Sequence, residues 1–277
     1  MERWNLARED PSAPPWPDAH LAGALSLPPH APPPCGPVDV QLCRTIRPGD
    51  YDSPGESTIL THYRDAFASA RRTIYLENQH PGEPSLLAAL DEALRRSVHV
   101  VMVVPGEPMP AVVHASREVA ARLAAGDASH RYTPAFRGLA SLAAHPNFTL
   151  VALARSDATP TGWSHREIYV HAKLCIVDGA WATLGSANFV DLSLLPDHTE
   201  LNATFWGESS CLPLLRQLVL EHTSLETSDD RSALATITAH ARAGSASRAA
   251  GGPIHGCYAL DPTCYGQHPL STAPEPS

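Results

Sequence analysis

The sequence has almost no lysine. Of its 20 basic residues, 19 are arginines and one, Lys173, is a lysine. A chain that uses arginine at every other basic position keeps a compact, mobile ammonium group here, which contacts an anion differently from a planar guanidinium. The count also excludes a second site built on a lysine, because the 277 residues contain no other.

Positive charge is scarce overall. The formal net charge is −9, which argues against broad binding of nucleic acid, because such binding requires a basic face that neutralises phosphates. The same balance argues against electrostatic attachment to anionic lipid. A local cationic pocket stays compatible with it.

Long apolar runs are missing as well. No run approaches the roughly 20 residues that a membrane span needs, and the first ten residues lack the basic-then-apolar layout of a signal peptide. We therefore expect a cytoplasmic chain without a transmembrane segment. The sequence leaves open whether it sits at the periphery of a membrane.

The six cysteines are scattered and form no zinc pattern. Cys43 and Cys175 lie in predicted strands and are interpreted as buried apolar residues. Cys257 and Cys264 have His255 nearby, but their spacing matches no zinc motif. We expect no metal site, and we interpret these two cysteines as free thiols in a loose tail.

Composition divides the chain into three parts. Residues 11–37 hold 10 of the 27 prolines, which predicts an extended connector, so 1–37 is interpreted as a linker and N-terminal remnant. One folded domain is predicted over 38–229. Residues 230–277 are predicted to form an alanine-rich helix followed by a flexible tail.

Between these ends the apolar pattern is that of an α/β fold. Val98–Val104 is a run rich in β-branched residues, which is typical of a strand buried on both faces. Asp178-Gly179 is a strong hairpin signal. These features predict a mixed β-sheet flanked by helices on both faces. Further strands are predicted over Val38–Ile46, Thr73–Asn78, Thr149–Ala154, Ile168–Asp178, Trp181–Leu184 and Glu200–Trp206, and helices after Ser57, over Pro84–Arg96, within 110–145 with breaks near Gly126 and Pro134, and over Cys211–His222.

Chemically active residues gather around the single lysine. His171 and Lys173 are two residues apart on a predicted strand, and period-two alternation places both side chains on the same face. A turn with Gly185, Ser186 and Asn188 follows and is rich in hydrogen-bond donors. Imidazole is a nucleophile and proton carrier near neutral pH, and a cation with nearby dipoles stabilises a phosphoryl transition state. The pattern favours a phosphodiester site.

The spacing of these residues resembles a known motif. His171-x-Lys173-x4-Asp178-x6-Gly185-Ser186-x-Asn188 is similar to the HKD motif of the phospholipase D superfamily at every motif position. The resemblance runs from about Val38 to His222 and is to the C-terminal half of two-motif phospholipase D and cardiolipin synthase-like enzymes. It includes Arg44-Thr45, Ile74-Tyr-Leu-Glu77-Asn78-Gln79, His198-Thr-Glu200-Leu-Asn202 and Leu215-Arg216 … Glu221-His222.

The resemblance implies a mechanism without metal or cofactor. In the family one histidine attacks phosphorus and forms a phosphohistidine, while a second protonates the leaving alcohol and then activates water or an acceptor alcohol. Here His171 would be the catalytic imidazole, Lys173 and Asn188 would hold the non-bridging oxygens, and Ser186 would add a donor. Glu200 lies where the family places a carboxylate that orients the histidine through its other nitrogen; the alternative is an unrelated ion pair.

Four further residues complete the expected site. Asp178, counted with the catalytic set, is interpreted as the anchor of its turn rather than as a substrate contact. Gly185 is expected beside the substrate. Glu77 and Gln79 either line the rim of the pocket or only end a strand, and Gln79 is the one expected to face substrate.

One part of the family pattern is missing. The family uses two motifs that face each other across one active site, and this chain has one. Single-motif relatives homodimerise around a two-fold axis, whereas this chain resembles the second half of a long enzyme. We expect its partner to be a second HKD-containing half or a second copy of the chain. The surface that packs against this partner should be apolar and exposed when the chain is alone.

The leading function is that of a phosphodiesterase or phosphatidyltransferase whose substrate is a phospholipid. No residue decides between water and an alcohol as the second substrate. Two alternatives stay open. One is an HKD-type nuclease, which the acidic balance and the lack of a basic, aromatic stripe disfavour. The other is a non-catalytic C-terminal half or assembly subunit, which the missing motif favours and the intact His171, Lys173 and Asn188 disfavour.

Overall fold

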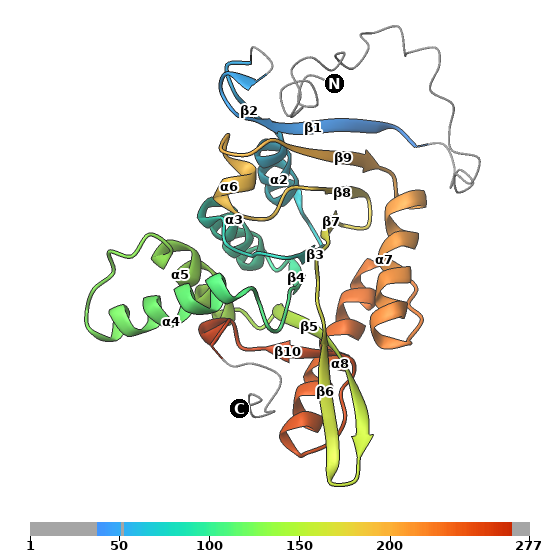
Figure 1. Cartoon of the computed structure of the whole chain (residues 1–277). Coiled ribbons are helices and arrows are strands. Elements are labelled where there is room, and N and C mark those ends of the chain that lie inside the picture. Colours follow the sequence, from blue (N-terminus) through green and yellow to red (C-terminus); the bar gives the residue numbers. More distant parts are fainter. Residues whose placement is uncertain (1–37, 51–52, 268–277) are drawn as a thin grey trace, which may run out of the picture.

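The computed structural model describes residues 38–50 and 53–267, and the proline-rich connector predicted over 1–37 lies outside them. The described strands form one sheet in the order β10-β5-β4-β3-β7-β8-β9-β1-β2, with β6 paired to β5. Figure 1 shows helices on both faces of this sheet, which confirms the predicted mixed α/β fold. The strands are β1 (Val40–Ile46), β2 (Glu56–Ser57), β3 (Thr73–Asn78), β4 (His99–Val103), β5 (Phe148–Thr159), β6 (Gly162–Ile168), β7 (Lys173–Val177), β8 (Trp181–Gly185), β9 (Glu200–Trp206) and β10 (His255–Leu260).

The centre of the sheet is its most buried part. β3 runs parallel to β4 and β4 runs parallel to β5, whereas β3 and β7 are antiparallel. Strands in the middle of a sheet that is covered on both faces carry near-continuous apolar sequence. Every residue of β3 is buried, and so are four of the five in β4. The buried strand predicted at Val98–Val104 is confirmed.

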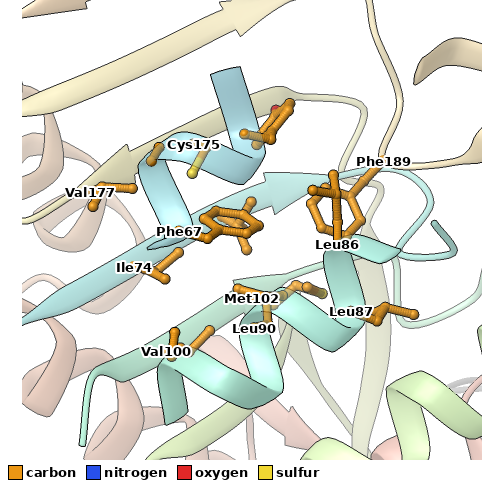
Figure 2. Packing of buried hydrophobic residues seen from close by; sticks show 14 of the residues in the cluster. Phe67, Ile74, Leu86, Leu87, Leu90, Val100, Met102, Cys175, Val177 and Phe189 are labelled. Atoms are coloured by element: carbon orange, nitrogen blue, oxygen red, sulfur yellow. The ribbon is translucent and has the colours of Figure 1, made fainter. Parts of the chain in front are cut away.

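Helices α2 (Thr58–Ser69) and α3 (Pro84–Arg95) cover one face of the sheet. Each helix turns an apolar stripe with three- and four-residue spacing toward the strands, as with Tyr63 and Phe67 on α2. Figure 2 shows how Phe67 and Phe189 lie between these helices and the sheet. The ring of Tyr63 meets that of Phe189 edge-on, with centroids 5.7 Å apart, a favourable aromatic arrangement.

Helices α7 (Glu208–Thr223) and α8 (Asp230–Ala249) cover the opposite face. Leu215 and Val219 of α7 pack with Leu234 and Ile237 of α8 in a second apolar cluster over β3, β4 and β7. Asp229 begins α8 with a capping box, in which its side chain accepts a hydrogen bond from the backbone N–H of Ser232.

The fold extends beyond the boundary predicted at residue 229. α8 belongs to the second apolar cluster, and β10 pairs antiparallel with β5 over six positions. The alanine-rich helix predicted after residue 229 is present as α8, whereas the flexible tail predicted to follow it is wrong as far as residue 267, because β10 and a 3-10 turn lie there. Cys257 is fully buried in β10 rather than in a loose segment. The local sequence contained no sign of β10, because the strand that pairs with it lies about a hundred residues away in the sequence.

The strand predicted over Ile168–Asp178 is shorter in the structure, because β6 ends at Ile168 and β7 covers Lys173–Val177. β6 forms a long hairpin with β5 that projects from the sheet (Figure 1), and β7 begins only at Lys173. His171 therefore lies in the segment that enters β7 and not on a strand. At the other end of β7, Asp178 and Gly179 have φ angles of 53° and 60°, which suit a type I′ turn. The predicted hairpin from β7 to β8 is confirmed.

Three helices flank one end of the sheet. They are α4 (Pro110–Ala124), α5 (Thr133–Ser141) and the short α6 (Asp191–Leu194), with 3-10 turns at Leu142–Ala144 and Pro262–Cys264. The breaks predicted near Gly126 and Pro134 are confirmed, since Gly126 follows the end of α4 with a φ of 79° and Pro134 lies in the first turn of α5. Within the described ranges, no helix has the length and apolar character to cross a membrane.

Candidate active site

The register between β3 and β7 creates the centre of the site. Asn78, the last residue of β3, lies directly opposite Lys173, the first residue of β7. The chain leaving β3 therefore passes over the lysine, and Gln79 accepts a hydrogen bond from Lys173 Nζ at 3.0 Å. The expectation that Gln79 faces this site agrees with the contact.

Lys173 also holds the histidine of the motif. Its Nζ donates to the backbone carbonyl of His171 at 2.7 Å and lies 3.3 Å from His171 Nδ1. An ammonium group has only donors, so Nδ1 accepts in this contact and a neutral imidazole carries its proton on Nε2. Although His171 lies outside the strand, its ring and the lysine meet as predicted.

The ammonium group is held in a tight environment. Lys173 is only 9% exposed, and its three hydrogen-bond contacts go to Gln79 and His171. Burial lowers the pKa of Lys173, and the charge of Glu200 partly opposes this effect. An anion bound beside Nζ would compensate the buried positive charge.

The turn after β8 brings Gly185 and Ser186 to the same end of the sheet. A Cβ atom on Gly185 would lie 2.2 Å from the carbonyl oxygen of Leu201 and 2.3 Å from Asn202 Oδ1, so only glycine fits between β8 and β9. Ser186 pairs with β9 through its backbone, since its N–H donates to Leu201 O at 3.0 Å. The Ser186 hydroxyl is exposed and accepts a hydrogen bond from the Leu201 N–H.

Glu200 bonds to serines in this structure. Its carboxylate accepts hydrogen bonds from the hydroxyl of Ser186 and, at 3.0 Å, from that of Ser193. Nδ1 of His171 contacts Lys173 instead. The role of Glu200 in orienting the imidazole therefore stays a prediction, and what the structure gives is a carboxylate that fixes the Ser186 hydroxyl and raises the pKa of Lys173 against the effect of burial.

Asn188 completes the motif with a free polar group. Its Oδ1 atom is buried and has no hydrogen-bond partner within the described residues. The neighbouring Phe189 is fixed in place, because its N–H donates to Asn78 Oδ1 at 3.0 Å and its carbonyl accepts from the N–H groups of Gly82 and Glu83. Asn78 thus ties the motif turn to β3, while the Asn188 amide stays available.

Glu77 does not line the rim of the site. It is paired in register with Leu174, and its contact with His222 shows that it faces α7. Lys173 is paired with the next residue, Asn78, and neighbouring residues of a strand point to opposite faces. The Glu77 carboxylate accepts from the hydroxyl of Tyr75 at 2.6 Å and contacts His222 Nε2 at 2.9 Å. Strand alternation separates it from Lys173, so of the two interpretations given to Glu77 the structural one fits.

Asp178 anchors the opposite end of β7. Its carboxylate accepts hydrogen bonds from the backbone N–H groups of Arg71, Arg72 and Thr73, at 2.7 to 2.9 Å. The five residues of β7 lie between it and the end of the chain segment that holds His171, and they span about 16 Å at 3.3 Å per residue. Its place in the motif is that of a structural anchor, as interpreted from the sequence, and not of a group at the site.

Three residues near the lysine carried no earlier prediction. His80 follows Gln79, and its pKa is lowered by burial and by the positive charges of Lys173 and His171. The Gln79 amide donates to the Tyr169 hydroxyl at 3.1 Å and contacts the sulfur of Met109. Only the adjacency of His80 to Gln79 was visible in the sequence.

A histidine, a buried lysine and a Gly-Ser turn, gathered at one end of a mixed sheet, are the features of a phosphodiesterase-type site. Residues 63–216 match the family described as cardiolipin synthase, PLD-like domain. The match covers more than half of the chain, and the chain therefore belongs to the phospholipase D-like family.

Several known proteins are similar to parts of this chain. A phospholipase D from Phytophthora infestans is 28% identical over 190 residues, which are 57% of this chain and 10% of that protein; the chain spans about a tenth of this relative. Nuc, a phospholipase D family member from Salmonella typhimurium, has a TM-score of 0.41 and 18% identity over 65% of this chain and 91% of its own. Phosphatidylserine synthase from Haemophilus influenzae has a TM-score of 0.41 and 10% identity over 64% and 36%.

Proposed function

We propose that this chain supplies one half of a metal-independent active site that cleaves or transfers the phosphodiester of a phospholipid. The observation that carries the proposal is the contact of Lys173 with both His171 and Gln79 at the mouth of the β3–β7 pair. The imidazole that we propose as the nucleophile thus lies beside the side chain of the only lysine in the sequence. The exposed ring of His171 is accessible to a substrate.

The proposed reaction has two displacements at phosphorus. In the first, a ring nitrogen of His171 forms a bond to phosphorus, the bond to the leaving alcohol oxygen breaks, and a second imidazole gives that oxygen a proton. In the second, the same imidazole removes a proton from water or an acceptor alcohol, whose oxygen bonds to phosphorus as the phosphohistidine bond breaks. Lys173 and Asn188 stabilise the charge on the non-bridging oxygens.

The second imidazole comes in this proposal from a partner, which an uncovered part of the sheet supports. Leu42 of β1 and Leu184 of β8 both lie opposite Ala203 of β9, so the two leucines share one face. Leu42 is 64% exposed and Leu184 is 44% exposed, and Val40 and Leu201 beside them are similarly open. This apolar surface adjoins Gly185 and is of the kind that a second HKD-containing half, or a second copy of the chain, would cover.

The test is an assay of phosphatidylcholine turnover in the presence of a metal chelator, with the chain alone and together with an HKD-containing half. We expect a phosphorylated histidine to be trapped in the active assembly and to be absent from His171→Ala. His255→Ala, at an exposed position of β10, is the control and should behave as wild type. Full activity of a monodisperse monomer would refute the need for a partner, and full activity of His171→Ala would refute the proposed chemistry.

A further inference from the structure

A cavity of about 520 Å³ opens beside the candidate active site. Its volume lies within the range of roughly 300 to 1,000 Å³ that is usual for small-molecule sites. It lies between α4, α5, the start of α6 and the segment that follows β3. Its walls are predominantly apolar and include Val112, Ala115, Ala135, Phe136 and Val190.

The cavity and the lysine share a boundary. His80 lines the cavity and directly follows Gln79, which accepts a hydrogen bond from Lys173. Met109 lines the cavity as well and contacts the amide of the same glutamine. A molecule whose phosphate lies at Lys173 would therefore extend an apolar group past His80 and Met109 into the cavity.

A second observation points to a ligand with a hydrogen-bond acceptor. Tyr265 lines the cavity and is 5% exposed, yet its hydroxyl has no hydrogen-bond partner within the described residues. Buried polar groups are almost always partnered, and an unpartnered one calls for an explanation. Burial raises the pKa of this phenol, so it stays a protonated donor. An ester carbonyl of a bound lipid would accept its hydrogen bond.

We infer that this cavity binds one ester-linked acyl chain of the substrate, with Tyr265 as a residue that determines specificity. The inference rests on the proposed function, because the phosphate at Lys173 fixes which end of the lipid enters. Tyr265 lies outside residues 63–216 that match the family. It reaches the cavity because β10 pairs with β5 and carries the chain back toward α4, where the Tyr265 carbonyl accepts from the Ser116 hydroxyl. The acidic net charge favours a lipid over a nucleic acid as the occupant.

The inference is tested by titrating the full chain with three soluble probes. These are dihexanoyl phosphatidic acid below its micelle concentration, its diether analogue, and glycerol 3-phosphate. We expect the dihexanoyl ester to bind at least about 10-fold more tightly than glycerol 3-phosphate, as burial of several methylene groups predicts. Ala135→Phe fills the cavity and should abolish this advantage while glycerol 3-phosphate still binds. Ala121→Phe, on the exposed side of α4, should keep it.

Tyr265→Phe supplies a second test with a smaller change. Loss of one hydrogen bond should weaken binding of the ester about 3- to 10-fold and leave the diether unchanged. Equal effects on ester and ether, or an unchanged advantage in Ala135→Phe, would overturn the inference. Competition by a single-stranded oligonucleotide that Ala135→Phe removes would also overturn it. If glycerol 3-phosphate does not bind and Lys173→Met changes nothing, the proposed function itself fails. Failure of the cavity inference alone would instead appear as equal binding of the ester and the ether.

Discussion

Glu77 and His222 are joined across the core, with 2.9 Å between the carboxylate Oε1 and the imidazole Nε2. Both side chains are less than 10% exposed. Glu77 belongs to β3, which also delivers Gln79 to the lysine, and His222 belongs to the last turn of α7. The pair therefore fixes the strand that carries the site against the helix behind it.

Removal of either partner should destabilise the protein. Among the described residues, His222→Ala leaves the buried Glu77 carboxylate with only the Tyr75 hydroxyl as partner, and such truncations cost about 3 kcal/mol or more. We expect this loss in the free energy of unfolding measured with urea. His255→Ala removes an exposed imidazole on β10 and should change the free energy of unfolding by less than about 1 kcal/mol. Equal stabilities of the two variants would contradict a structural role for the pair.

Lys173→Met should separate activity from stability. The methionine removes the ammonium that faces the phosphate, and loss of one such group costs about 100-fold or more in rate. Because burial disfavours the charge of Lys173, the free energy of unfolding should stay equal or rise. Lys173→Arg keeps the charge but puts a larger planar group at a position where the lysine is only 9% exposed, so turnover by this variant should also be slow. Activity above a tenth of wild type in Lys173→Met would contradict the assignment.

Asp178→Ala should be unstable but chemically competent. It leaves the N–H groups of Arg71, Arg72 and Thr73 without their acceptor, at a cost of about 2 to 4 kcal/mol. Asp178→Asn keeps an acceptor and tolerates the positive φ, so it should lose less. Turnover per folded molecule should be unchanged in Asp178→Asn. A large fall in turnover without loss of stability would instead indicate a direct role at the site.

The pH dependence of stability should carry a contribution from His80. Burial and the charges of Lys173 and His171 hold its pKa below the ordinary value of 6.5. Between the folded-state pKa and 6.5 the unfolded chain binds more protons, so stability rises with pH across this window and falls on acidification. From pH 7 to pH 5, wild type should therefore lose more stability than His80→Gln, as measured by urea midpoints. A loss in His80→Gln as large as that of wild type would contradict the prediction.

Local patterns predicted the centre of the fold but not its C-terminal edge. The strand at Val98–Val104 and the Asp178-Gly179 turn were predictable, because a few consecutive residues are enough to indicate burial on both faces or a positive φ. The pairing of β10 with β5 depends on residues far apart in the chain. The sequence around Gly251 reads as flexible because nothing local indicates that partner.

The candidate site divides in the same way. The motif spacing identified His171, Lys173 and Gly185, and the register of β3 with β7 explains why Gln79 joins them. Strand alternation also explains why Glu77 does not reach the site: Glu77 and Asn78 point to opposite faces of β3, and Asn78 is the residue paired with Lys173. No local signal predicts that Tyr265 reaches the cavity next to the site, because its position depends on the whole sheet.

Three successive residues at the end of β3 and just after it have three different contacts: Glu77 bonds to His222 of α7, Asn78 bonds to the motif turn, and Gln79 bonds to Lys173. A shift of one residue in this strand would exchange its faces, bury the asparagine against α7 and carry the carboxylate to the lysine. An insertion anywhere between Thr73 and His80 would therefore disrupt the core and the site in a single event, whereas one at the tip of the projecting β5–β6 hairpin would leave both intact.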